Sequence, residues 1–167
     1  RELLLPTNFH SYAYKNNPLP IGFEQTISQP YIVALMTEAL NLKGNEIILE
    51  IGTGSGYQTS VLSLLSRRVY SIERIKPLLV NALLCFKKLK LTNIVSKHDD
   101  GFLGWPKLAP FDHLIITCAI KKIDDRLLNQ VRYNGICIAP VATSLNQQRL
   151  KKIIVKDKRE SDIWEDL

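Results

Sequence analysis

Two hydrophobic patterns alternate along the chain from residue 29 onward. Over Gln29–Leu42 apolar side chains return every three or four residues, which predicts an amphipathic helix with Ser28 as its N-cap and Pro30 in its first turn. Short apolar runs rich in β-branched residues follow, each of a length typical of a buried strand. We expect five such strands, at Glu46–Ile51, Val69–Glu73, Ile94–Lys97, Phe111–Cys118 and Gly135–Val141.

Helical patterns separate these strands. Helices are expected at about Tyr57–Ser66, Pro77–Leu89 and Asp124–Tyr133. A chain that alternates strand and helix forms βαβ units, whose strands run parallel. The predicted fold class is therefore α/β, with a mostly parallel twisted sheet and helices on both faces.

The two ends of the chain lack this alternation. Residues 1–28 are rich in Pro, Asn and Tyr without helical periodicity, and Pro18 and Pro20 favour extended backbone, so we expect an irregular arm. The tail at 146–167 is basic and then acidic, with room for one more strand at Lys151–Lys156. We interpret residues 1–167 as one domain, made of this arm, a core at 29–145 and a C-terminal tail that is incomplete at its end.

Composition narrows the class of protein. Apolar residues make up 46% of the 167 residues and charged residues 23%, which is ordinary globular usage and argues against a disordered or collagen-like chain. No apolar run approaches the ~18 residues that span a bilayer. Three cysteines without a CxxC pair favour a reduced, cytoplasmic protein, and three scattered histidines predict no metal site. The net charge of +6 is compatible with nucleic-acid binding, although a solvated surface explains it equally simply.

A glycine-rich turn lies between the first expected strand and the helix that follows. It reads Glu50-Ile-Gly-Thr-Gly-Ser-Gly-Tyr57, so glycine stands at positions 52, 54 and 56. Such a turn lets the backbone and a helix N-terminus approach a ligand closely. A dinucleotide fingerprint needs glycine where Tyr57 stands, and Glu73 lies about 20 residues on, as a ribose-binding carboxylate does. S-adenosylmethionine (SAM) fits this pattern better than NAD, because SAM has a ribose and an amino-acid end but no pyrophosphate.

Further polar residues follow the third and fourth strands. Asp99-Asp100-Gly101 comes after one, and Thr117, Cys118 and Ala119 end the other. Ligands of open α/β sheets bind beyond the carboxyl ends of the strands, so these residues are expected near the glycine turn. The carboxylate of Asp100 would accept a hydrogen bond from the adenine amino group.

Several segments together resemble the protein-L-isoaspartate O-methyltransferase family. The most specific are PLPIG at 18–22 and QTISQPY at 25–31. Also similar are EIGTGSGYQ at 50–58, VYSIER at 69–74, GWP at 104–106 and APFD at 109–112. The resemblance extends from about Arg1 to Leu150. It implies a Rossmann-like SAM-dependent methyltransferase fold.

The resemblance also implies an activity and a set of site residues. Members of the family methylate the free carboxylate of L-isoaspartyl residues in damaged proteins, which is a repair reaction. Ser28 corresponds to the active-site residue, within a loop that covers cofactor and substrate. With the analysis of the turn, the expected SAM-binding residues are Gln25, Thr26, Glu50, Gly52, Gly54, Gly56, Glu73, Asp100 and Gly101. The expected substrate-binding residues are Ile21, Gly22, Thr117, Cys118 and Ala119.

Some positions depart from the family pattern. Glu24 stands where the bacterial GxGQT sequence has its second glycine, Asn16 replaces an acid, and Asp99 replaces a glycine. Two alternatives therefore stay open: a methyltransferase acting on another substrate such as RNA, and a SAM-binding module without catalysis. We expect isoaspartyl-containing proteins and peptides as partners, rather than nucleic acid or a membrane, and a monomer.

Overall fold

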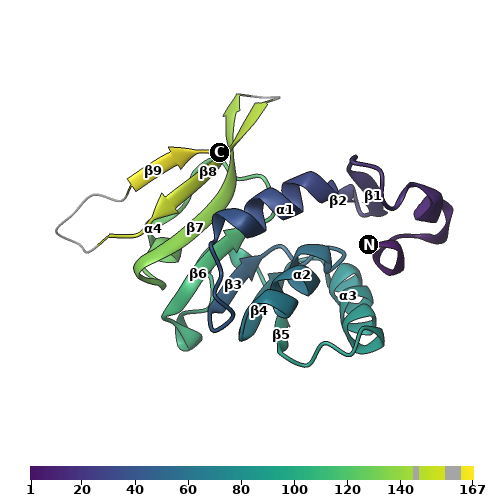
Figure 1. Ribbon diagram of the computed structural model, residues 1–167, viewed down its shortest axis with the longest axis horizontal. Coiled ribbons are helices and arrows are strands. Elements are labelled where there is room, and N and C mark those ends of the chain that lie inside the picture. Colours follow the sequence, from purple (N-terminus) through teal and green to yellow (C-terminus); the bar gives the residue numbers. More distant parts are fainter. Residues whose placement is uncertain (145–146, 157–162) are drawn as a thin grey trace.

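The computed structural model describes residues 1–144, 147–156 and 163–167, and a seven-stranded sheet forms its centre (Figure 1). The strand order is β5-β4-β3-β6-β7-β8-β9. Five strands run parallel, namely β3 (Ile47–Ile51), β4 (Arg68–Glu73), β5 (Ile94–His98), β6 (Phe111–Ile116) and β7 (Val131–Ser144). Two further strands, β8 (Gln147–Ile154) and β9 (Ile163–Asp166), extend the sheet in antiparallel fashion. The predicted α/β class with a mostly parallel sheet is confirmed.

Both faces of the sheet are covered, and strand alternation explains how. On β3, Ile48 packs with Met36 of α1 and Leu62 of α2, whereas its neighbour Leu49 joins the opposite cluster around Phe111. The helices are α1 (Pro30–Ala39), α2 (Tyr57–Leu65), α3 (Lys76–Lys88) and the short α4 (Asp125–Leu128). On the Leu49 face, α4 is joined by two 3₁₀ turns, η3 (Gly101–Leu103) and η4 (Pro106–Leu108).

The N-terminal arm is more ordered than its sequence indicates. It contains two 3₁₀ helices, η1 (Glu2–Leu4) and η2 (Thr7–Tyr12), and a hairpin of β1 (Leu19–Gly22) and β2 (Gln25–Ile27). The expectation of an irregular arm over residues 1–28 is therefore wrong. The order comes from long-range contacts that no local periodicity reveals, because Leu4, Leu5, Ala13 and Ile27 form a third buried cluster.

The start of α1 also differs from the prediction. The helix begins at Pro30 with Gln29 as its N-cap, and no side chain caps it there. Ser28 is thus not the capping residue. The side-chain oxygen of Asn16 accepts the N–H of Tyr31 at 3.0 Å, so the arm supplies an acceptor for one first-turn N–H. This contact leaves the hydroxyl of Ser28 available for another role.

Two further boundaries need correction. The helix expected at Asp124–Tyr133 ends at Leu128, because Val131 pairs with Phe111 and starts β7. The N–H of Phe111 donates to the carbonyl of Gln130 at 2.8 Å, so strand pairing takes the backbone that a longer helix would need. The strand expected at Lys151–Lys156 overlaps β8, which begins earlier, at Gln147, and ends earlier, at Ile154.

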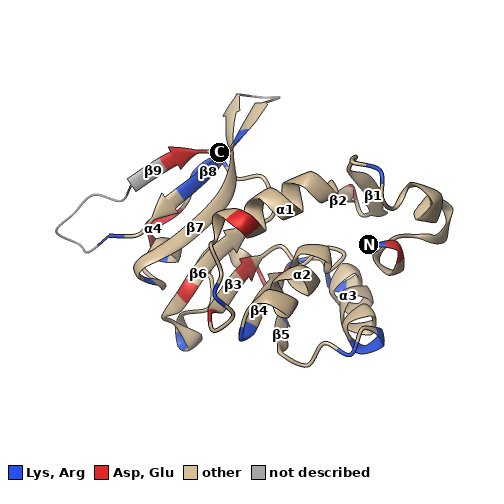
Figure 2. Ribbon diagram, in the orientation of Figure 1, with Lys and Arg blue, Asp and Glu red and all other residues tan. Residues whose placement is uncertain are grey.

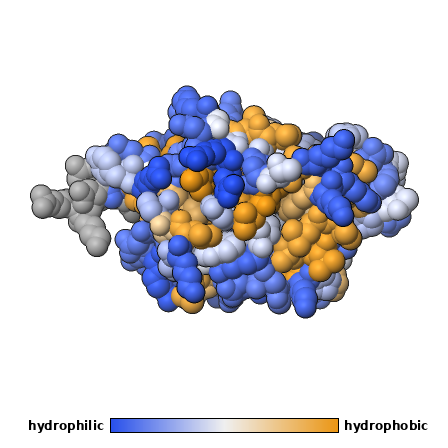
Figure 3. Space-filling model, turned by 90° about the horizontal axis from the view of Figure 1, so that it is seen from below, coloured by the Kyte–Doolittle hydropathy of each residue, from blue (hydrophilic) through white to orange (hydrophobic). Residues whose placement is uncertain are grey.

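Charge and hydropathy vary over the surface. Figure 2 shows basic residues on β8 facing acidic residues on β9, and ion pairs join Lys151 to Asp166 and Lys152 to Glu165. Figure 3 shows an apolar area among polar side chains, and α3 contributes exposed Val80, Leu83 and Leu84 to the surface. Within the described ranges, no helix combines the length and apolar character needed to cross a membrane.

Candidate active site

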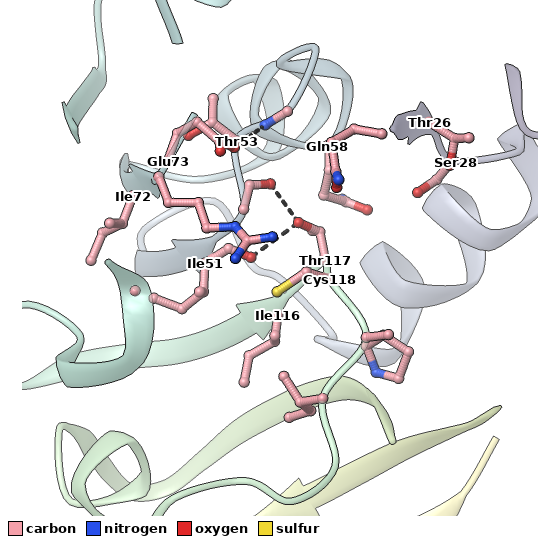
Figure 4. Close-up of a pocket in the computed structure, with 18 of the residues that line it drawn as sticks. Thr26, Ser28, Ile51, Thr53, Gln58, Ile72, Glu73, Ile116, Thr117 and Cys118 are labelled. Carbon is pink, nitrogen blue, oxygen red and sulfur yellow. Dashed lines mark hydrogen bonds between the residues drawn. The ribbon is translucent and has the colours of Figure 1, made fainter. Parts of the chain in front are cut away.

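A cleft of about 910 Å³ opens at the carboxyl ends of β3, β4 and β6 (Figure 4). This volume lies within the range of small-molecule sites. The cleft brings together residues from the hairpin, the glycine turn, the start of α3 and the loop after β6. Twelve predicted site residues line it: Ile21, Gln25, Thr26, Ser28, Gly52, Gly54, Glu73, Asp100, Gly101, Thr117, Cys118 and Ala119.

The glycine turn forms the floor of the cleft. Gly52 has φ +99°, and a Cβ there would lie 2.6 Å from the hydroxyl oxygen of Thr117. The hydroxyl of Thr117 in turn lies 3.0 Å from the carbonyl of Ile51. Only glycine therefore lets the ends of β3 and β6 approach this closely at this backbone conformation.

Glu73 lies at the end of β4, on one side of the cleft (Figure 4). Its side chain is buried, and its two carboxylate oxygens accept the N–H groups of Gly54 at 2.7 Å and Ile75 at 2.8 Å. These bonds fix the carboxylate against the glycine turn. A carboxylate has about four lone-pair sites, so capacity remains for the hydroxyl groups of a ribose.

Asp100 and Gly101 follow β5 at the rim of the cleft. Asp100 is exposed, and its carboxylate accepts the N–H of Phe102 at 3.0 Å as the cap of η3. Gly101 packs directly against the side chain of Ile51, where a Cβ would clash. Gly101 is thus required for packing against β3.

Thr26 and Ser28 lie on the opposite side of the cleft from Glu73 (Figure 4). The β1–β2 hairpin carries Thr26, and Ser28 follows directly after β2. Ser28 is half-buried, and among the described residues its hydroxyl group has no hydrogen-bond partner. A hydroxyl in that position can donate to a bound group.

The segment Thr117–Ala119 follows β6 and also lines the cleft. Cys118 is exposed at its surface. Although part of its surface is exposed, the protein around the sulfur partly desolvates it. This desolvation, with the nearby carboxylates of Glu73 and Asp100, raises the pKa of the Cys118 thiol above its usual range. The thiol is therefore neutral at pH 7, which does not favour a nucleophilic role.

Three predicted residues do not line the cleft. Gly22 ends β1 at the hairpin turn, with φ +89°. Gly56 begins α2 with φ +84°, and a Cβ there would lie 2.6 Å from the ring of Phe86. Glu50 is fully buried, so Glu50 and Gly56 support the glycine turn from behind, whereas Gly22 belongs to the hairpin.

Glu50 is held by two hydroxyl groups. Thr59 donates to one of its carboxylate oxygens at 2.5 Å and Ser71 to the same oxygen at 2.7 Å. The other oxygen is buried without a partner in the described chain. Burial raises the pKa of Glu50 to about 7, against which the two hydroxyl groups act only partly. Glu50 thus joins the ends of β3 and β4 to the start of α2.

Gln58 also lines the cleft, although it is not among the predicted site residues. Its amide nitrogen donates to the hydroxyl of Thr37 in α1 at 2.8 Å, and that hydroxyl donates to the carbonyl of Val33 at 2.7 Å. The link ties α2 to α1 behind the arm. The sequence signal that could have identified Gln58 is a polar residue in the first helical turn after the glycines.

In the part of the chain that the structure describes, no group of three or more His, Cys, Asp or Glu residues has a geometry that could hold a metal ion. The cleft instead offers a fixed carboxylate, an exposed carboxylate and a glycine-rich turn. These features fit an adenosine with a ribose, because Glu73 and Asp100 lie at separate points of one continuous wall.

Comparisons with known proteins agree with this geometry. Residues 1–166 match the family described as protein-L-isoaspartate(D-aspartate) O-methyltransferase (PCMT). A curated relative from Dictyoglomus thermophilum, named protein-L-isoaspartate O-methyltransferase, is 50% identical over 141 residues, which cover 84% of this chain and 64% of the relative. A relative of the same name from Aliivibrio salmonicida is 48% identical over 100% of this chain and 80% of its own length.

A solved structure points the same way. A protein from Plasmodium falciparum, described as a putative protein-L-isoaspartate O-methyltransferase in complex with S-adenosyl-L-homocysteine, superposes with a TM-score of 0.78. It is 25% identical, and the match covers 92% of this chain and 77% of that one. The chain thus spans between 64% and 80% of the length of the two curated relatives above.

Proposed function

The chain belongs to the protein-L-isoaspartate(D-aspartate) O-methyltransferase family, and we propose that it transfers a methyl group from SAM to the free carboxylate of L-isoaspartyl residues in damaged proteins. The proposal rests on one observation: residues expected to bind SAM and residues expected to bind the substrate line the same cleft. We assign Glu73 and the glycine turn to the cofactor, and Ser28 and Thr117–Ala119 to the substrate; all of them line the cleft.

The cofactor supplies an electrophilic methyl group on a sulfonium centre. Toward it, Glu73 would accept the ribose hydroxyl groups with the lone pairs that Gly54 and Ile75 leave open. Asp100 would accept the adenine amino group, and Gly52, Gly54 and Gly101 would keep the wall free of side chains. Gln25 and Thr26 would close the cleft from the hairpin.

The acceptor needs no general base. A carboxylate with an ordinary pKa near 4 is already ionised at pH 7, so the oxygen is nucleophilic without loss of a proton. Catalysis then rests on holding that oxygen in line with the methyl group, and orientation is worth several kcal/mol. The hydroxyl of Ser28, which has no partner within the described ranges, would donate to the carboxylate and orient it.

A methyl-transfer assay tests the proposal directly. We expect turnover of an isoaspartyl peptide and none of the matched aspartyl peptide. Ser28→Ala should lower kcat by about 10- to 100-fold, the worth of one hydrogen bond to a charged group, while the Kd for S-adenosylhomocysteine stays unchanged. A folded protein that binds S-adenosylhomocysteine but methylates no isoaspartyl peptide would instead be a binding module or act on another substrate.

We propose further that the protein works as a cytoplasmic monomer on isoaspartyl-containing proteins and peptides. No disulfide joins Cys85, Cys118 or Cys137, which is consistent with a reducing compartment. Size-exclusion chromatography with light scattering, in the presence of S-adenosylhomocysteine, checks the oligomeric state.

A further inference from the structure

The cleft contains acidic side chains that have hydrogen-bond or ion-pair partners in the described structure, and one that has none. Glu73 holds the N–H groups of Gly54 and Ile75, as described above. Asp100 holds the N–H of Phe102, and Asp124 forms an ion pair with Arg126 at 2.8 Å. Glu24 also lines the cleft, yet its carboxylate has no hydrogen bond or ion pair with any residue that the structure describes. Its negative charge is therefore available to a ligand.

Glu24 has a fixed place at the mouth of the cleft. Phe23 and Glu24 form the two-residue turn between β1 and β2, where Gly22 is the register partner of Gln25. Both have positive φ, 53° and 57°, which is typical of a type I′ turn. Such turns favour Gly, Asn or Asp, so the geometry of the turn does not account for a glutamate. Both side chains are exposed.

The substrate must pass this turn. The proposed function seats the isoaspartyl carboxylate near Ser28, which lies four residues after Glu24. At about 3.3 Å per residue the two positions are at most about 13 Å apart along the hairpin. A side chain one or two positions from the isoaspartyl residue of a bound polypeptide can therefore approach the Glu24 carboxylate to about a Debye length, ~10 Å.

We propose that Glu24 selects isoaspartyl sequences with a lysine or arginine within two residues of the isoaspartyl residue. The inference rests on the proposed function. An uncompensated carboxylate attracts such a cation and repels an acidic neighbour, while the acceptor carboxylate itself lies deeper in the cleft. Glu24 is thus a specificity-determining residue, and it does not touch the reacting atoms.

The test compares three isoaspartyl peptides that differ only in the residue after the isoaspartyl position, which is Lys, Gln or Glu. With the wild-type protein we expect kcat/KM to rank Lys above Gln above Glu, by about 3-fold per step, as an exposed ion pair gives. Glu24→Gln should remove the ranking and Glu24→Lys should reverse it. In 0.5 M NaCl the wild-type ranking should shrink toward equality, because salt screens exposed charges.

Controls separate this effect from others. Glu38→Gln makes the same change of charge on the exposed side of α1, outside the cleft, and should leave the wild-type ranking intact. The three peptides are compared on the same protein sample. A smaller fraction of folded protein therefore lowers all three kcat/KM values equally and leaves their ratios unchanged. Equal kcat/KM for the three peptides, or a ranking that persists in Glu24→Gln, overturns the inference. Absence of turnover even on the Gln peptide would instead count against the proposed function.

Discussion

Glu50 is a fully buried residue whose protonation is strongly shifted by the fold. Its pKa rises from 4.5 to about 7 because the carboxyl group is fully buried. Below pH 4.5 the group is neutral in both the folded and unfolded states, so nothing is lost. Between pH 4.5 and 7 the unfolded chain has lost this proton while the folded chain keeps it, so the free energy of unfolding falls by a total of about 3 kcal/mol across that window and falls no further above pH 7.

Glu50→Gln should remove this pH dependence. The amide keeps an oxygen acceptor for Thr59 and Ser71 but does not titrate. Urea unfolding at pH 5, 6.5 and 8 measures the effect, and the variant should gain stability relative to the wild type as the pH rises. Glu38→Gln, on an exposed residue, serves as the control. A variant whose stability follows the same pH slope as the wild type would show that Glu50 is ionised in the folded protein.

Gly56 illustrates a motif residue that is needed for packing rather than for ligand contact. Gly56→Ala should lower the free energy of unfolding by about 2–4 kcal/mol, from the left-handed backbone and the collision with Phe86. Gly44→Ala is the matched control, because Gly44 also has positive φ, +99°, but has open space around its Cβ position. Thermal unfolding of both variants measures how much more stability Gly56→Ala loses than Gly44→Ala. That difference reports the collision with Phe86 alone. Equal losses would refute the packing role of Gly56.

At the scale of elements, periodic segments were predictable and the arm was not. The strands β3 to β6 and the helices α2 and α3 follow the local pattern to within a few residues. The arm depends on Arg1, whose guanidinium donates to the carbonyls of Ala13, Asn17 and Ser28 at 2.6–3.0 Å. Contacts between residues 12 to 27 positions apart leave no local signature. The same reasoning explains why the strand pairing of Val131 overrides its helical surroundings.

The predicted site shows the same division. Twelve of its residues meet in the cleft because the family motifs identify positions at strand ends, which topology then brings together. Gly56, Glu50 and Gln58 were harder to assign, since whether a motif residue faces the ligand or the core depends on packing against α1 and α3. Motif membership alone does not distinguish the two roles.

Removing the Arg1 contacts should loosen the arm without affecting the sheet. We expect Arg1→Met to speed amide hydrogen exchange in Leu19–Ile27 by about 10- to 100-fold, since several hydrogen bonds worth about 1 kcal/mol each are lost. Exchange in β3 and β4 should stay unchanged. Arg67→Met, at an exposed position after α2, is the control. Hydrogen-exchange mass spectrometry resolves the segments, and equal acceleration in the sheet would argue against a local role for Arg1.

Across the whole molecule, the cleft is lined by several separate elements of the fold. The hairpin, the glycine turn and the loop after β6 come from distant parts of the sequence, and each contributes lining residues. A ligand that touches all three binds only the folded state, so it stabilises the fold by linkage. The molecule should therefore report occupancy of the cleft as a change in its unfolding temperature.

S-adenosylhomocysteine at 100 times its Kd should add about 2.7 kcal/mol to the free energy of unfolding. For a domain of this size that raises the Tm by about 5–10 °C. NAD at the same concentration should give no shift, because Tyr57 occupies the position where a dinucleotide site needs glycine. Differential scanning calorimetry measures both. Glu73→Ala should reduce the Tm shift produced by S-adenosylhomocysteine, since the ribose loses its acceptor. For the wild-type protein, an equal Tm shift with NAD would show that the turn does not discriminate between the two ligands.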